Sequence, residues 1–107
     1  MIVNIEKKSE EIGLKPEFVK MLFDAFVQES AQILKNLQEA TLKKDFDAIE
    51  RHAHSFKGSS GNLQLNEMYE LSKSIEFAAK DKKVDFNYID STNKLLEDFN
   101  GLEVVLS

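Results

Sequence analysis

The sequence contains no cysteine. This absence excludes disulfide bonds, thiolate metal sites, iron–sulfur clusters and cysteine nucleophiles. Glycine and proline are scarce, with four glycines and one proline in 107 residues, which argues against a catalytic fold rich in turns. Arginine occurs only at Arg51, and the formal net charge is -5. Proteins that read nucleic acids usually carry a basic face rich in arginine, so we expect no nucleic-acid partner.

Long apolar runs are absent as well. No stretch approaches the roughly 20 apolar residues that a membrane span needs, and Met1 to Lys8 lack the apolar middle of a signal peptide. We therefore expect a cytoplasmic protein without a membrane partner. The length is that of a single domain covering residues 1–107, and the apolar share of 42% is sufficient for a core.

A long helical pattern begins at Pro16 and runs to about Lys43. Proline suits the first turn of a helix, and Glu17 places a negative charge where the helix dipole favours it. Glu29 interrupts the apolar stripe of this helix, so we expect a bend or partial exposure near Glu29 and Ser30. The stripe has three- and four-residue spacing and consists of Phe18, Leu22, Ala25, Phe26, Ile33, Leu37 and Ala40.

A second helix is expected after Asp45, which is a candidate N-cap. Its core stripe alternates between three- and four-residue steps, which is typical of a helix packed against other helices. The stripe consists of Phe46, Ile49, Ala53, Phe56, Ser60 and Leu63.

Two further helices complete the pattern. Asn66 is a candidate cap for the third, whose inward positions are Met68, Tyr69, Ser72, Ile75 and Ala79. A polar loop follows over residues 80–85, and a fourth helix carries Phe86, Ile89, Leu95, Leu96, Phe99 and Leu102 on its inner side. A short extra helix with Ile5 and Ile12 is expected at the N-terminus. Because the strand signal is weak, the predicted fold class is all-α, an up-and-down four-helix bundle.

The segment from Arg51 to Leu63 departs from an ordinary helix because it contains two glycines. Each costs about 1 kcal/mol relative to alanine in a helix interior. At about 100° per residue, His54 lies roughly 130° from the centre of the apolar stripe, and Gly58 lies almost opposite it, with Gly61 on the same outer face. We therefore expect an exposed histidine ring on a bare helix surface that another protein can approach closely.

Lys57 lies on the shoulder of this outer face, three residues after His54. We expect its side chain to be exposed and its ammonium group to reach whatever the ring carries. The two glycines could instead allow close helix packing, but their outer position argues against that. A metal site at His52-x-His54 is a further alternative. Residues two apart on a helix point to different sides, so we predict no metal and regard His52 as a polar residue on a flank.

The segment His54-Ser55-Phe56-Lys57-Gly58-Ser59-Ser60 resembles the H-x-x-K-G-[SA] signature of histidine phosphotransfer (HPt) domains. The resemblance covers roughly residues 18–80. One departure is visible, because family members often have a glycine-alanine pair where this chain has Gln64-Leu65. The flanks also resemble the family, through Ala53, Leu63, the loop Lys44-Asp45 and the stretch Ile75-Glu76-Phe77-Ala78-Ala79.

This resemblance implies a phosphoryl carrier of two-component signal transduction. A response-regulator receiver domain would hand a phosphoryl group from its aspartate to His54, which would pass it to another receiver. Lys57 would stabilise the phosphoryl oxygens, and Gly58 would keep the approach clear. The implied partners are receiver domains and a sensor histidine kinase. The chain would need no cofactor of its own, since the receiver would supply Mg²⁺.

The chemistry of these residue types agrees with that expectation. An imidazole with the ordinary pKa of about 6.5 is largely neutral near pH 7 and is then a good nucleophile. Phosphoryl transfer depends mostly on alignment and charge stabilisation. The chain has no glycine-rich phosphate loop and no nucleotide motif, so we expect a phosphoryl carrier and not an autonomous kinase.

Two alternative functions stay open at this point. A helical interaction module without chemistry fits the acidic balance and the apolar stripes, although it leaves the two glycines unexplained. The phosphorylated domain of a larger histidine kinase, of the hybrid or chemotaxis type, would share the fold and the histidine. Both a free-standing shuttle and such a domain fit the sequence.

Overall fold

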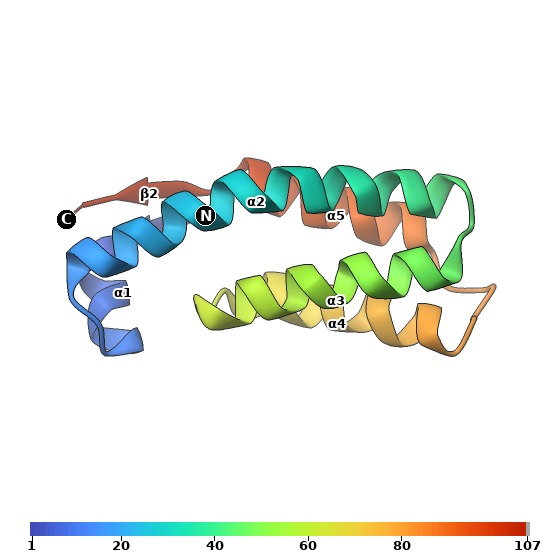
Figure 1. The fold of residues 1–107 in the computed structure, drawn as a ribbon, viewed down its shortest axis with the longest axis horizontal. Helices are drawn as coiled ribbons and strands as arrows, with labels where there is room; N and C mark the ends of the chain where they lie inside the picture. Colours follow the sequence, from blue (N-terminus) through green and yellow to red (C-terminus); the bar gives the residue numbers. More distant parts are fainter. Residues whose placement is uncertain (107) are drawn as a thin grey trace.

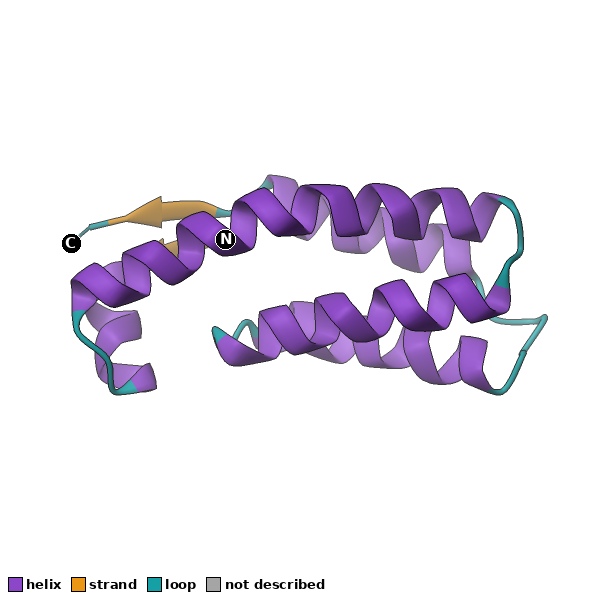
Figure 2. Ribbon diagram, in the orientation of Figure 1, coloured by secondary structure: helices purple, strands orange, loops and turns teal. Residues whose placement is uncertain are grey.

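The computed structural model describes residues 1–106 and contains five helices and two short strands. Four long helices make up most of the molecule, and the two strands lie together at one end (Figures 1 and 2). In chain order the elements are β1 (Ile2–Asn4), α1 (Ile5–Ile12), α2 (Pro16–Leu42), α3 (Phe46–Asn62), α4 (Asn66–Lys80), α5 (Tyr88–Asn100) and β2 (Glu103–Val105).

The helices α2 to α5 form an up-and-down bundle, as the sequence predicts. Each of these helices runs opposite to the one before it, and the neighbours around the bundle are α2 with α3, α3 with α4, α4 with α5, and α5 with α2 (Figure 1). The helix α2 has 27 residues and α3 has 17. The N-terminal part of α2 therefore runs past the end of α3, and α1 packs against it there. No helix within residues 1–106 is long and apolar enough to cross a membrane.

Local sequence signals explain where most helices begin. Pro16 stands in the first turn of α2, and the Asp45 side chain accepts a hydrogen bond from the Ala48 amide at the start of α3. The start of α4 differs from the prediction, because Asn66 is the first helical residue and makes no capping bond. The loop after α4 extends through Asn87, so Phe86 precedes α5.

The three turns between the bundle helices share one backbone conformation, a left-handed residue shortly after the helix end. Lys44, Gln64 and Lys82 follow the helix ends with φ angles of 55°, 53° and 52°. In each turn the next amide bonds back to a carbonyl of the last helical turn, as the Leu65 amide does with the Ser60 oxygen. This left-handed closing residue is usually glycine. None of the three is glycine here, so each turn carries a conformational cost.

The apolar stripe predicted for α2 is wrong in its first half. Val19 and Phe23 are buried, whereas Phe18 and Leu22 are 50% and 43% exposed. The error arises because apolar residues are adjacent in the sequence, as Phe18 and Val19 are, so that two apolar stripes are possible. The two stripes are offset by one residue, which is a rotation of about 100° around the helix axis. On the buried stripe Ser30 takes a core position and Glu29 lies outside, and α2 is one continuous helix. The stripe of α3 is buried as predicted, apart from the half-buried Phe46.

Aromatic packing fixes the rotation of α3 within the bundle. The Phe56 ring is fully buried, with its centroid 5.6 Å from that of Phe26 on α2 and 6.3 Å from that of Phe99 on α5. Ile89 of α5 is 47% exposed and does not face this core, contrary to the prediction. Because Phe56 points inward, the residues two before and two after it on α3 point outward.

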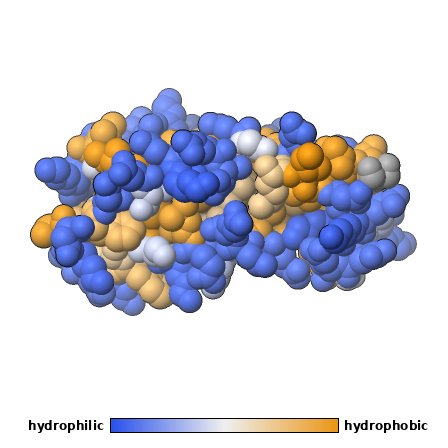
Figure 3. Space-filling model, turned by 180° about the vertical axis from the view of Figure 1, so that it is seen from behind, coloured by the Kyte–Doolittle hydropathy of each residue, from blue (hydrophilic) through white to orange (hydrophobic). Residues whose placement is uncertain are grey.

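The two strands were not predicted. β1 and β2 pair in parallel, with Val3 opposite Val104, and the Met1 ammonium donates to the Gly101 carbonyl at 3.0 Å. Strands of three residues are too short to show an alternating pattern, and their pairing spans almost the whole chain. Val3 is buried, while Ile2 and Leu106 remain exposed. On the face behind that of Figure 1, apolar surface appears toward both ends of the molecule (Figure 3).

Candidate functional site

His54 stands on the outer surface of α3, where the helical period places it. Its neighbours Ala53 and Phe56 are fully buried, whereas the His54 side chain is 67% exposed. Side chains on a helix lean toward its N-terminus, which for His54 is the direction of the turn that contains residues 50 and 51. The rigid core contacts of α3 hold the backbone of His54, and the ring itself faces solvent.

Glu76 of α4 holds one edge of this ring. Its Oε2 lies 2.8 Å from Nδ1 of His54, and its side chain is only 9% exposed. Burial raises the pKa of Glu76, but hydrogen bonds from Lys57 and from the imidazole outweigh burial and leave this pKa below its ordinary value. The carboxylate is therefore ionised near pH 7 and can only accept. Nδ1 must donate to it, so in the neutral ring the lone pair is on Nε2.

The sequence predicts an exposed Lys57, but the structure shows its side chain largely buried. Its side chain is 18% exposed, and its ammonium pairs with Oε1 of Glu76 at 2.7 Å. The same ammonium lies 5.4 Å from the ring centroid of Phe77, and Lys73 lies 5.8 Å from that centroid. The shoulder position on α3 allows the long side chain to fold toward α4, where a buried carboxylate attracts it. Lys57 thus neutralises Glu76 in this structure.

The two glycines of α3 have different environments. A Cβ atom added at Gly58 would meet no atom within 4 Å, so the outer surface there is bare. A longer side chain at this position would lean over the preceding turn, which carries His54. A Cβ at Gly61 would lie 3.0 Å from Cδ2 of Tyr69 on α4. Gly61 therefore allows close packing of α3 on α4, which corrects the expectation that it only clears the outer face.

His52 lies apart from this network. Its side chain is half-buried on the flank of α3 that faces the end of α2. Desolvation by burial lowers the pKa of His52, and the nearby charge of Arg51 lowers it further. Among the described residues 1–106, no group of three or more His, Asp or Glu side chains is placed to hold a metal ion.

Apolar surface lies beside the C-terminal end of α3. Met21 and Leu22 of α2 follow Phe18 by three and four residues, so the three lie on the same side of the helix, and they are 65%, 43% and 50% exposed. We call these three residues the α2 apolar patch. It continues into a groove lined by Leu22, Ala25, Phe26 and Glu29 of α2 and by Ser59, Asn62 and Leu63 of α3.

Glu76 was the main omission of the sequence analysis. The predicted stripe of α4 contained Ser72, Ile75 and Ala79. Glu76 is four residues after Ser72 and three before Ala79, so it falls on the same buried side. An ionisable residue at an inward position rarely lies there without a partner. That signal was sufficient to mark Glu76 as a candidate but was not used, and it could not identify His54 and Lys57 as its partners.

A family model described as Hpt domain matches residues 21–102, which include α3, α4 and α5 and most of α2. No curated protein and no solved structure gives a significant match.

Proposed function

The chain belongs to the Hpt domain family, which has a phosphotransfer role in two-component signalling, and we propose that His54 is the residue that carries the phosphoryl group. The observation that carries this proposal is the exposed ring whose Nδ1 is held by the buried Glu76 carboxylate at 2.8 Å. This arrangement directs the free Nε2 lone pair outward. It supports a carrier over an interaction module without chemistry, since a docking surface alone needs no oriented imidazole.

The proposed step transfers a phosphoryl group from the aspartyl phosphate of a receiver domain. The Nε2 lone pair attacks phosphorus, a P–N bond forms, and the P–O bond to the aspartate breaks. The electron pair of that bond remains on the aspartate carboxylate. Because Nδ1 keeps its proton, positive charge develops on the ring, and the Glu76 carboxylate 2.8 Å away stabilises it. In the reverse step the same lone pair returns to Nε2 when the phosphoryl group leaves.

The receiver domain would dock over the outer face of α3. The bare surface at Gly58 and the α2 apolar patch beside the C-terminal end of α3 support this orientation, because they combine close approach with apolar area that can be buried. The receiver would supply the Mg²⁺ and the carboxylates that bind it. We also propose that the chain acts in the cytoplasm, where it would meet these partners.

The test is phosphoryl transfer from a phosphorylated receiver in the presence of Mg²⁺. The protein should acquire label that is labile in acid and stable in alkali, as expected for a phosphoramidate. His54→Gln should abolish the label, and His52→Gln should retain most of it. Label that persists in His54→Gln would contradict the assignment.

A further inference from the structure

The resemblance implies that Lys57 stabilises the phosphoryl oxygens of His54, but in this structure its ammonium is already paired with the Glu76 carboxylate. The carboxylate of Glu76 and the ammonium of Lys57 already form an ion pair at 2.7 Å, so with a neutral ring the three groups carry no net charge. A phosphoryl group adds about two negative charges near pH 7. The positive charge on the phosphorylated ring compensates only one of them. The phosphorylated site therefore has an excess of negative charge, close to a carboxylate that repels it.

Arg51 is an exposed cation on the same outer surface of α3 as His54. It is three residues before His54 on α3, and residues at this spacing are neighbours on a helix surface. Helical side chains lean toward the preceding turn, which for His54 contains Arg51, and Nε2 is the ring nitrogen directed away from Glu76. Arg51 is exposed, and within residues 1–106 its guanidinium group has no ion pair. It is also the only arginine in the chain.

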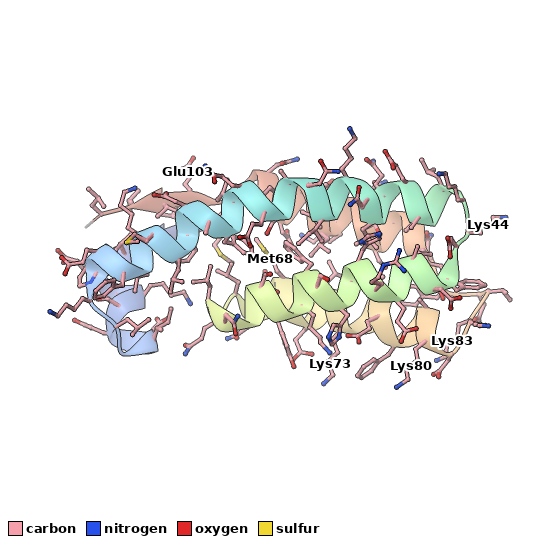
Figure 4. The ribbon with its side chains drawn as sticks, in the orientation of Figure 1. Lys44, Met68, Lys73, Lys80, Lys83 and Glu103 are labelled. Carbon is pink, nitrogen blue, oxygen red and sulfur yellow. The ribbon has the colours of Figure 1, made fainter. Side chains whose placement is uncertain are left out.

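We propose that the guanidinium group of Arg51 binds the phosphoryl oxygens of phosphorylated His54, while Lys57 remains paired with Glu76. This inference rests on the proposed function, because it requires that His54 is phosphorylated. A guanidinium group presents two parallel N–H donors to phosphate, and such charge-assisted hydrogen bonds are among the strong ones in proteins. Lys73 and Lys80 are alternative cations on α4 (Figure 4). Lys73 lies near this pair, 5.8 Å from the centroid of the Phe77 ring that Lys57 also approaches, so the test below includes Lys73.

The inference can be tested directly because a single arginine gives a single Nε–Hε signal in a ¹⁵N-labelled sample. We expect that signal to shift when the protein is phosphorylated by a receiver domain, and to stay in place in His54→Gln under the same conditions. A signal that does not move while His54 carries the phosphoryl group would overturn the inference and leave the proposed function intact.

A second measurement compares the fraction of phosphorylated protein at equilibrium with the same receiver. Arg51→Gln should lower the ratio of phosphorylated to free protein by about tenfold, and Arg51→Lys should recover part of the loss. Lys35→Gln removes an exposed charge from α2 and should leave the ratio unchanged. An unchanged ratio in Arg51→Gln, or a loss found in Lys73→Gln instead, would overturn the inference. No phosphorylation of the unaltered protein would refute the proposed function, and the inference with it.

Discussion

Glu76 and His54 stand 22 residues apart on neighbouring helices, and Oε2 of the carboxylate lies 2.8 Å from Nδ1 of the ring. The carboxyl group is almost fully buried, while the ring is mostly exposed. A buried, ionised acceptor thus fixes one edge of a surface imidazole and leaves the other edge to solvent. The predictions below follow from this pair and from the backbone that positions it.

Removal of the carboxylate should change both the tautomer and the reactivity of His54. In Glu76→Ala, the proton on Nδ1 loses its acceptor, so Nε2 should become protonated in a larger share of neutral rings. A hydrogen bond to a charged group contributes about 1.5–3 kcal/mol, so transfer should slow by about tenfold to a hundredfold. Long-range ¹H–¹⁵N spectra report the tautomer, and label transfer reports the rate.

Glu70 provides the matched control for this experiment. It is an exposed glutamate on the same helix, and its carboxylate makes no ion pair in the described part of the chain. Glu70→Ala should retain the tautomer and the rate of the unaltered protein. Equal rates for Glu76→Ala and Glu70→Ala would show that the Glu76 contact does not assist transfer.

The ion pair of Glu76 predicts a specific dependence of stability on pH. The pKa of Glu76 is lowered in the folded protein, so the unfolded chain takes up the proton first as the pH falls. This group therefore stabilises the fold fully above its unfolded pKa of about 4.5, and the contribution is lost as the pH falls through the lower folded value. Lys57→Ala should cost about 1–2 kcal/mol of unfolding free energy at pH 7 and much less at pH 3.

Urea unfolding at both pH values measures this difference. Lys20→Ala is the control, because Lys20 forms an ion pair with Asp24 at 2.9 Å but is 50% exposed. Exposed pairs contribute about 0–1 kcal/mol, so this variant should change little at either pH. A cost for Lys57→Ala that is the same at pH 7 and pH 3 would contradict the importance of its pairing with Glu76.

The two glycines of α3 should respond differently to the same substitution. Gly58→Ala should stabilise the protein by about 0.5–1 kcal/mol, because alanine is the better helix former and its Cβ meets no atom within 4 Å. Gly61→Ala should show no such gain, because its Cβ would press on the Tyr69 ring at 3.0 Å. Gly58→Leu should keep the fold but slow transfer from the receiver by about tenfold or more, since the side chain would lie over His54.

Thermal unfolding and transfer rates distinguish these effects. Stabilisation by Gly58→Leu together with slow transfer is the expected pair of results. Normal transfer in that variant would mean that the receiver does not approach over Gly58.

Gln64 stands where members of the family often have glycine, and its backbone conformation is one that favours glycine. It follows α3 with a φ of 53°, a conformation in which glycine has no steric cost, and its carbonyl accepts from the Lys8 ammonium at 2.9 Å. Gln64→Gly should therefore raise the unfolding free energy by about 0.5–1 kcal/mol. Gln28→Gly, at an exposed position inside α2, should lower it by about 1 kcal/mol. A loss of stability in both variants would contradict this interpretation of the turn.

Local periodicity was sufficient to predict the bundle and the orientation of α3. The stripe through Phe56 has no competing stripe beside it, so the outward position of His54 follows from the helical period alone. In α2 the neighbours Phe18 and Val19 are both apolar, and only contacts with the other helices decide which of them is buried. The pairing of Val3 with Val104 is likewise invisible in the local pattern because it joins distant parts of the chain.

The candidate site was only partly predictable for a related reason. The position of Lys57 on the helix was right, but the direction of a flexible side chain depends on Glu76, which another helix supplies. The buried position of Glu76 was readable from its spacing to Ala79. Its contact with His54 required the distance between α3 and α4, which Gly61 shortens by admitting Tyr69.

The most direct test of the central claim identifies the nitrogen of His54 that carries the phosphoryl group. In His52→Gln, His54 is the only histidine, so its two ring nitrogens can be observed without overlap in a ¹⁵N-labelled sample. After transfer from a phosphorylated receiver, we predict coupling between ³¹P and Nε2, with Nδ1 still protonated. Phosphorus bonded to Nδ1, or a phosphorylated protein with no phosphorus on either nitrogen, would contradict the account.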